Sequence, residues 1–458
     1  MSGGVSVRAR RSADPRPGPG YARLGAYLVG GFAALQVVFF LLLVVGQAVP
    51  DRPIVAHLAQ SVEAGTYGPA SVPDRQGGIS DTFTECVVVG TGLGALDGEN
   101  AFERAVYMPR ISHCDGGADD IRALAVGGES AHGSYYKYWA GYTIITRPVL
   151  ALAGLEGLRI VSGAMLLGSL ALAFSQVARR TSTYAAVALT APILLATNIT
   201  STPSTSFSQA ISLSFIFLST ALVAWGAGGG RLRLAGSTML GAALFCFVDL
   251  LTTPAIPWAL ASAVAASITY SRNRSLGRAA AVGVGVAVLW PISFALTWVS
   301  RWIIASLFLG WNEVMSFVRS NVAYRATGDE PFIDSSLGAP TKINVLYWWD
   351  KVPTAPWVLV AVALLAVALL AVAVRRGGAG RLGAALVLAL PALVVPVWYE
   401  ALSNHSQIHS FFTYRGVPTA LGIALFACAV TTLRRRSALE TGRHEASVPV
   451  ELEKAGVS

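Results

Sequence analysis

Long apolar stretches alternate with short polar connections along most of this chain. A helix needs about 20 predominantly apolar residues to cross about 30 Å of hydrocarbon. Ten stretches approach or exceed this length, and they predict transmembrane helices at residues 24–49, 157–178, 182–198, 207–226, 235–251, 254–271, 279–300, 354–374, 382–399 and 416–433. The pattern therefore predicts an all-α, polytopic membrane protein.

The composition agrees with this fold class. Of the 458 residues, 54% are hydrophobic and 13% are charged, whereas soluble domains contain about 25% charged residues. The net charge is +9. Because the arginines occur in small groups between apolar stretches, they indicate a membrane-topology signal rather than a nucleic-acid partner.

Clusters of arginine precede the first span and then recur in every second connection, at residues 8–23, 179–180, 231–233, 272–278, 375–381 and 434–436. The positive-inside rule places such clusters in the cytoplasm. We therefore expect a multi-pass protein of the plasma membrane with both termini cytoplasmic. Residues 1–23 and 434–458 are polar and predict disordered arms on either side of a transmembrane domain at 24–433.

Two large connections, residues 50–156 and 301–353, then lie outside the cytoplasm. Within the first, Ile54, Val55, Leu58 and Val62 recur at helical spacing and predict an amphipathic helix along the membrane interface. The stretch "RPVLALAGLEGLRI" predicts a second interfacial helix that leads into the next span.

Two of the four cysteines, Cys86 and Cys114, also lie in the first large connection. A disulfide can persist in an extracytoplasmic compartment. The sequence leaves open whether these two residues pair, because pairing depends on the distance between their Cα atoms.

A run of aromatic residues, "SYYKYWAGY", ends this connection. Tyrosine and tryptophan are enriched where a protein crosses the membrane–water boundary, so the run predicts an aromatic belt that anchors the chain. Tyr138 and Trp139 are also candidates for substrate binding.

Acidic residues in the first connection are candidate catalytic groups. Asp81 and Glu85 are four residues apart and share a face if they lie on a helix. Paired carboxylates can act as base and acid, or can bind a divalent cation, although we expect no firm cofactor. Asp51 directly follows the first span. The structural alternative for Asp81 and Asp51 is capping of a helix N-terminus.

Asp249 lies at the outer end of the fifth predicted span, in "FCFVDLLTTPAIP". A carboxylate within a span costs about 2.5–3.5 kcal/mol on insertion scales. Such a residue faces a polar cavity or a partner, so Asp249 either lines a substrate site or forms a hydrogen bond between helices.

The last outer connection contains "NHSQIHSFFTYR". His405 and His409 are four apart and point the same way on a helix, and Arg415 opens the last span. Histidines beside an arginine are suited to bind an anionic phosphate. A metal site is a weaker alternative, because no clear third ligand follows, and a structural polar turn is another. We expect no metal site.

The ten-span layout, the long first outer loop with interfacial helices and the acidic residues in it resemble the GT-C class of integral-membrane glycosyltransferases. Loop one contains no DxD motif, and "DTFTE" at residues 81–85 is a looser match. The resemblance implies transfer of sugar from a polyprenyl-phosphate donor to a cell-envelope acceptor at the outer face. By position, Asp51 or Asp81 matches the catalytic acid of the class.

In that reading one carboxylate is the general base for an acceptor hydroxyl, and Arg415 with His405 or His409 stabilises the phosphate leaving group. Two other classes remain open. A transporter or lipid flippase places its binding groups near the midplane and often uses broken helices. A non-enzymatic envelope scaffold would present loop one to a partner. In every case the lipid bilayer is the surrounding medium.

Overall fold

The computed structural model describes residues 20–68, 79–94, 98–111, 114–130, 132–327, 330–331, 333–334 and 336–433. The first helix already begins at Tyr21, inside the predicted N-terminal arm. The remainder of that arm and the predicted C-terminal arm lie outside the described residues.

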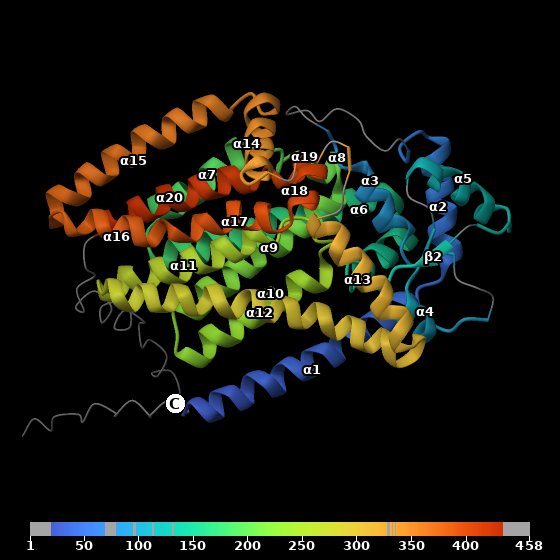
Figure 1. Cartoon of the computed structure of the whole chain (residues 1–458). Coiled ribbons are helices and arrows are strands. Elements are labelled where there is room, and N and C mark those ends of the chain that lie inside the picture. Colours follow the sequence, from blue (N-terminus) through green and yellow to red (C-terminus); the bar gives the residue numbers. More distant parts are fainter. Residues whose placement is uncertain are drawn as a thin grey trace, which may run out of the picture.

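Long helices lie side by side and form an elongated bundle (Figure 1). They are α1 (Tyr21–Gln47), α6 (Thr143–Arg180), α7 (Thr183–Leu195), α9 (Phe207–Ala227), α10 (Arg231–Val248), α11 (Ala255–Asn273), α12 (Leu276–Leu309), α15 (Ala355–Gly377), α16 (Gly380–Ala389) with η1 (Leu390–Leu393) and α17 (Val394–Ala401), and α20 (Gly416–Thr432). All ten stretches predicted as spans are therefore helical.

Within the described residues, eight helical segments are long and apolar enough to cross a membrane. This confirms the prediction of an all-α, multi-pass membrane protein. The other two predicted spans correspond to α7, which has 13 residues, and to α11, whose 19 residues are mostly buried among other helices. The total of ten spans stays a prediction.

The first large connection folds into a small compact unit beside the bundle. It contains α2 (Asp51–Glu63), α3 (Thr82–Gly90), α4 (Ala101–Tyr107) and α5 (Cys114–Ala125). Two short strands, β1 (Pro109–Ile111) and β2 (His132–Ser134), pair in antiparallel register with Arg110 opposite Gly133. Cys86 and Cys114 form a disulfide that joins α3 to α5, with Cα atoms 5.2 Å apart.

The predicted amphipathic helix is α2, and its apolar residues are the four that are buried: Ile54, Val55, Leu58 and Val62. These side chains belong to one core cluster with residues of α5 and α6. The helix was predicted to turn this face toward the membrane. In the structure, protein covers the face, because α5 and α6 supply the apolar surface on which it packs.

The second predicted interfacial helix and the following span are continuous in α6. The chain changes direction at Gly154, where φ is +63° and ψ is −161°. Glycine adopts this conformation at little cost, since it has no Cβ. A Cβ at this position would lie 3.4 Å from the Cβ of His57 on α2, which is van der Waals contact, so the positive φ of the bend is what favours glycine here.

The aromatic run at residues 135–142 is buried rather than displayed toward lipid. Tyr135, Tyr136, Tyr138, Trp139 and Tyr142 are each 7% exposed or less. The predicted belt is therefore wrong as an outward-facing surface. The rings pack inward because α12 and the first-loop unit enclose them from both sides.

Short helices close one end of the bundle: α8 (Thr202–Thr205), α18 (Ser403–Ile408) and α19 (Ser410–Thr413), with α13 (Trp311–Thr327) and α14 (Ala339–Lys351) beside them (Figure 1). We call this end, together with the first-loop unit, the pocket end. The opposite end, where α10 and α12 begin and α6, α11, α15 and α20 finish, carries many arginines, and we call it the arginine end.

Candidate functional site

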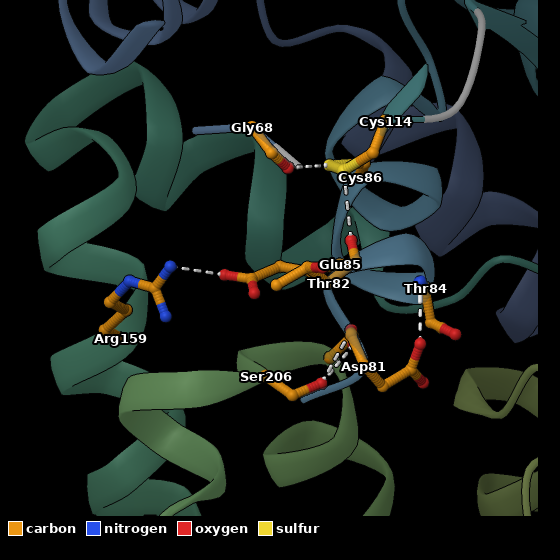
Figure 2. Close-up of a disulfide and its surroundings, with 10 residues drawn as sticks. Gly68, Asp81, Thr82, Thr84, Glu85, Cys86, Cys114, Arg159 and Ser206 are labelled. Atoms are coloured by element: carbon orange, nitrogen blue, oxygen red, sulfur yellow. Dashed lines mark hydrogen bonds and ion pairs between the residues drawn. A yellow bond between two sulfur atoms is a disulfide. The ribbon is translucent and has the colours of Figure 1, made fainter. Parts of the chain in front are cut away.

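Asp81 directly precedes α3 at the pocket end and is 3% exposed. Its Oδ1 accepts a hydrogen bond of 3.0 Å from the backbone N–H of Thr84, so Asp81 is the N-cap of α3, as the structural alternative predicts. The hydroxyl of Ser206 donates to the backbone oxygen of Asp81 at 2.9 Å (Figure 2). Helix α3 and the bundle therefore each bind this residue through one hydrogen bond.

The second oxygen of Asp81 begins a hydrogen-bond chain into the bundle. Oδ2 accepts from Nε2 of Gln209 at 2.6 Å, and Oε1 of Gln209 accepts from Arg415 at 2.7 Å. The amide orientation is determined by its partners, because the carboxylate only accepts and the guanidinium only donates. Gln209 thus links Asp81, a predicted catalytic carboxylate, to Arg415, a predicted phosphate-binding residue, without placing the two charges in direct contact.

Arg415 is 2% exposed and is held on a second side by Asn198. Its Nε donates to Oδ1 of Asn198 at 2.9 Å, and the hydroxyl of Tyr414 donates to the same oxygen at 3.0 Å. Burial raises the pKa of the Asp81 carboxyl, whereas the hydrogen bonds from Thr84 and Gln209 and the charge of Arg415 lower it. Asp81 and Arg415 therefore belong to one electrostatic unit.

Glu85, one turn along α3, has a different partner. Its Oε1 lies 2.7 Å from a guanidinium nitrogen of Arg159 on α6 (Figure 2). The carboxylate is almost fully buried, while the arginine is partly exposed. Burial raises the pKa of Glu85 to about 7; Arg159 opposes this rise, and Asp81 and Glu156 add to it. Asp81 and Glu85 are therefore close in sequence, yet they have separate cationic partners.

Asp249 follows the last residue of α10 and is 3% exposed. It accepts hydrogen bonds from the backbone N–H of Thr252 at 2.8 Å and from the Thr252 hydroxyl. Ser212 donates a further hydrogen bond. Burial raises the pKa of Asp249 to about 6 despite these donors, so the carboxylate is ionised at neutral pH and can accept a proton.

The two histidines of the last connection both contact Arg325 of α13. Nη1 of Arg325 lies 3.1 Å from Nδ1 of His405 and 2.9 Å from Nε2 of His409. Since a guanidinium only donates, both ring nitrogens accept and both rings are neutral. Burial, together with the charge of Arg325, lowers the pKa of His409 to about 3. The position between the rings is occupied by this guanidinium.

Arg325 also lines a small pocket of about 70 Å³ together with Lys137, Tyr138, Leu251, Trp298, Trp302, Val318, Asn321, Val322 and Leu402. Nζ of Lys137 is 3.3 Å from Oδ1 of Asn321. Burial, together with the charges of Arg325 and Arg110, lowers the pKa of Lys137 to about 8. The pocket thus combines two cations with aromatic and aliphatic walls.

Helix α9 brings the two buried aspartates near each other. Asp81 contacts Gln209, and Asp249 contacts Ser212; residues three apart on a helix are neighbours on its surface. Asp249 also interacts electrostatically with Tyr138, which lines the pocket and contacts Arg325. The backbone of Leu251 and Thr252, just after Asp249, interacts electrostatically with His405.

Five predicted site residues therefore form one cluster at the pocket end: Asp81, Asp249, His405, His409 and Arg415. Tyr138 joins them as a wall of the pocket. Glu85 lies at the same end but pairs separately with Arg159. Asp51 and Trp139 lie outside this cluster. The Asp51 carboxylate pairs with Arg104 at 2.7 Å and Arg147 at 2.5 Å. Trp139 is fully buried and packs edge-on against Phe39 and Phe247, and its indole N–H donates to the Thr297 carbonyl.

Sequence reasoning missed Arg325, Lys137 and Gln209. Arg325 lies in a polar helix, "NEVMSFVRSNVAYR", which also carries Glu313 and Arg319, so only its contacts distinguish it. Lys137 gave a usable signal, because it is the one lysine inside the aromatic run "SYYKYW". Gln209 opens a predicted span, where an amide is costly without a partner.

The chain matches no protein-family model, no curated protein and no solved structure. Among the described residues, no group of three or more histidine, cysteine, aspartate or glutamate side chains could hold a metal ion. The arrangement of this site is consequently the basis for the functional argument.

Proposed function

We propose that this protein is a membrane-embedded glycosyltransferase, which transfers sugar from a polyprenyl-phosphate donor to an acceptor of the cell envelope. The observation that carries the proposal is the pocket lined by Lys137, Arg325 and Tyr138. The buried Asp249 carboxylate interacts electrostatically with Tyr138. Two cations suit a phosphate, apolar walls suit a prenyl chain, and a carboxylate with a pKa of about 6 suits a general base.

The proposed chemistry assigns each group one task. The acceptor hydroxyl oxygen attacks the anomeric carbon of the donor sugar, and the bond from that carbon to the phosphate oxygen breaks. Asp249 takes the hydroxyl proton, and the polyprenyl phosphate leaves with the bonding electron pair. Arg325 and Lys137 stabilise the charge that develops on this leaving group. His405 and His409 position Arg325 by accepting its hydrogen bonds.

The Asp81–Gln209–Arg415 chain has a supporting task in this proposal. The side chains of Asp81 and Arg415 are both buried, and both form hydrogen bonds. They hold the start of α9 against α3 and α20, and α9 in turn supplies the Ser212 hydroxyl to Asp249. Asp81 is thus a positioning residue, and Asp249 replaces it as the proposed base.

Two observations support placing the pocket end outside the cytoplasm. The disulfide between Cys86 and Cys114 belongs to the pocket end, and disulfides persist in oxidising compartments. The opposite end carries the arginine clusters at residues 179–180, 231–233, 272–278 and 375–381, which the positive-inside rule assigns to the cytoplasm.

The proposal can be tested with full-length protein in nanodiscs and a short-chain polyprenyl-phosphate hexose that carries tritium in the sugar. We expect Asp249→Asn to abolish sugar release while leaving donor binding intact. We expect Arg325→Gln to weaken binding of the donor. Arg319→Gln is a matched control, because Arg319 is an exposed arginine on the same helix.

Equal binding of the donor by the Arg325→Gln and Arg319→Gln proteins would contradict the phosphate assignment. Translocation of the intact donor across the bilayer, without cleavage of the sugar–phosphate bond, would instead support the transporter or flippase alternative and overturn the proposed reaction.

A further inference from the structure

A second hollow lies at the arginine end, at the opposite end of the bundle from the pocket. It has a volume of about 780 Å³ and lies among the beginnings of α1, α10 and α12 and the end of α11. Arg231 of α10, Arg272 and Asn273 of α11 and Arg278 of α12 form its polar rim. Three helices therefore each supply at least one arginine to one opening.

Below this rim the wall is apolar. Helix α12 contributes Val282, Gly285, Val286 and Leu289, which extend over about 10 Å at 1.5 Å per residue. A Cβ built on Gly285 would meet no atom within 4 Å. The missing side chain thus leaves room along the wall, and Leu24 of α1 also lines the hollow.

The charge in the hollow has one sign. Among the described residues that line it, none is an aspartate or glutamate. Arg272 uses one nitrogen, Nη1, for a hydrogen bond of 3.2 Å to the Ala227 carbonyl, and a guanidinium has five N–H donors. The rim can therefore offer several charge-assisted donors to an anion, and arginine forks match phosphate oxygens well.

We propose that this hollow is a binding site for an anionic phospholipid, with the phosphate at Arg231, Arg272 and Arg278 and an acyl chain along α12. A free anion would use the rim alone, whereas a phospholipid also uses the apolar wall that begins directly beneath it. Basic pockets between transmembrane helices are known to take such head groups. This inference does not depend on the proposed transferase activity.

The test uses the purified full-length protein, with lipid binding measured by native mass spectrometry and by the midpoint of thermal unfolding. The probes are phosphatidylglycerol, phosphatidylcholine and inorganic phosphate. We expect Arg272→Gln/Arg278→Gln to weaken phosphatidylglycerol binding about 25-fold, at about fivefold for each arginine. Arg179→Gln/Arg375→Gln removes two exposed arginines at the same end but outside the hollow, and we expect it to have little effect.

A second variant tests the wall without changing any charge. Gly285→Phe fills the open space beside α12, so phosphatidylglycerol binding should fall although all three arginines remain. Unchanged binding in this variant would overturn the placement of the acyl chain, even if the arginine variant failed to fold. Equal protection by inorganic phosphate would reduce the site to a simple anion site, and equal binding of phosphatidylcholine would remove the role of charge.

Discussion

The two ends of the bundle use arginine in opposite ways. At the pocket end, Arg415 is buried and its donors meet side chains from α9 and from the residues after α7. At the arginine end, Arg376 and Arg381 donate to backbone carbonyls in the last turn of α20, at Thr431 to Leu433. The arginine at the pocket end connects side chains that are distant in sequence. The arginines at the other end cap a helix whose last carbonyls lack partners within the helix.

This difference separates charges that determine orientation from charges that build a site. Exposed arginines beside a span act through their position relative to the membrane, and helix-capping arginines can be exchanged for other donors. A buried arginine must have its partners arranged around it, because an unpaired buried charge is costly. The pocket end is accordingly the region where single substitutions should have the largest effects.

The largest expected effect comes from Arg415. In Arg415→Gln, Gln209 and Asn198 lose a charged donor inside the protein, and each such hydrogen bond contributes about 1.5–3 kcal/mol. We expect the midpoint of thermal unfolding to fall sharply. Arg375→Gln, which changes an exposed arginine at the other end, should shift the midpoint little, since surface substitutions stay within about 0.5 kcal/mol.

Similar midpoints for these two variants would contradict the comparison between the ends. Arg415→Lys tests the same comparison more sharply, because lysine retains the charge but lacks the guanidinium fork that reaches Gln209 and Asn198 together. We expect the unfolding midpoint of this variant to lie between those of Arg415→Gln and the parent protein.

The next largest effect concerns the disulfide at the pocket end. Cys86 and Cys114 are 28 residues apart, and closing a loop of this length stabilises a protein by roughly 3.5 kcal/mol in the chain-entropy description. Cys86→Ser/Cys114→Ser should unfold at lower temperature than the parent. A reducing agent should lower the midpoint of the parent only; the same response in the variant would show that the effect arises elsewhere.

The contrast between the ends also explains what could be predicted from the sequence. Spans follow from length and hydropathy, which are local properties, so every predicted span is helical. Asp81, Asp249 and Arg415 were identified because a charge near an apolar stretch is conspicuous. Arg325 was not, since its helix is polar and its importance depends on His405, eighty residues away.

Burial of the aromatic run shows the same limit. Tyrosine and tryptophan near a span are typical of a lipid boundary, and the same composition suits a packed interface. Trp298 and Trp302 of α12 donate to the Lys137 carbonyl from the facing side. Only this tertiary contact distinguishes an inward-facing cluster from a belt, and the sequence of residues 134–142 does not contain it.

A smaller effect is expected in the pH dependence of the proposed reaction. Asp249, with a pKa of about 6, must be ionised to accept a proton, and Lys137, with a pKa of about 8, must be protonated to hold phosphate. Sugar transfer should therefore fall below about pH 6 and above about pH 8. Lys137→Arg should move only the alkaline limit upward, because arginine stays charged; an unchanged limit would exclude Lys137 as its cause.

The smallest effect distinguishes Glu85 from the other buried acids of the pocket end by its contribution to the pH dependence of stability. Burial raises the pKa of Glu85 from 4.5 to about 7, so between these values the folded protein binds more protons than the unfolded chain. Stability then falls as the pH rises through this window. Glu85→Gln has no such titration, and we expect its unfolding midpoint to decline less between pH 5 and pH 8.

Asp81 and Asp249, whose pKa values are also raised, should preserve part of this decline in the Glu85→Gln protein. The control variant Glu63→Gln changes an exposed position of α2, and we expect it to show the full decline. A parallel decline in the Glu85 and Glu63 variants would mean that Arg159 compensates the buried charge fully at neutral pH.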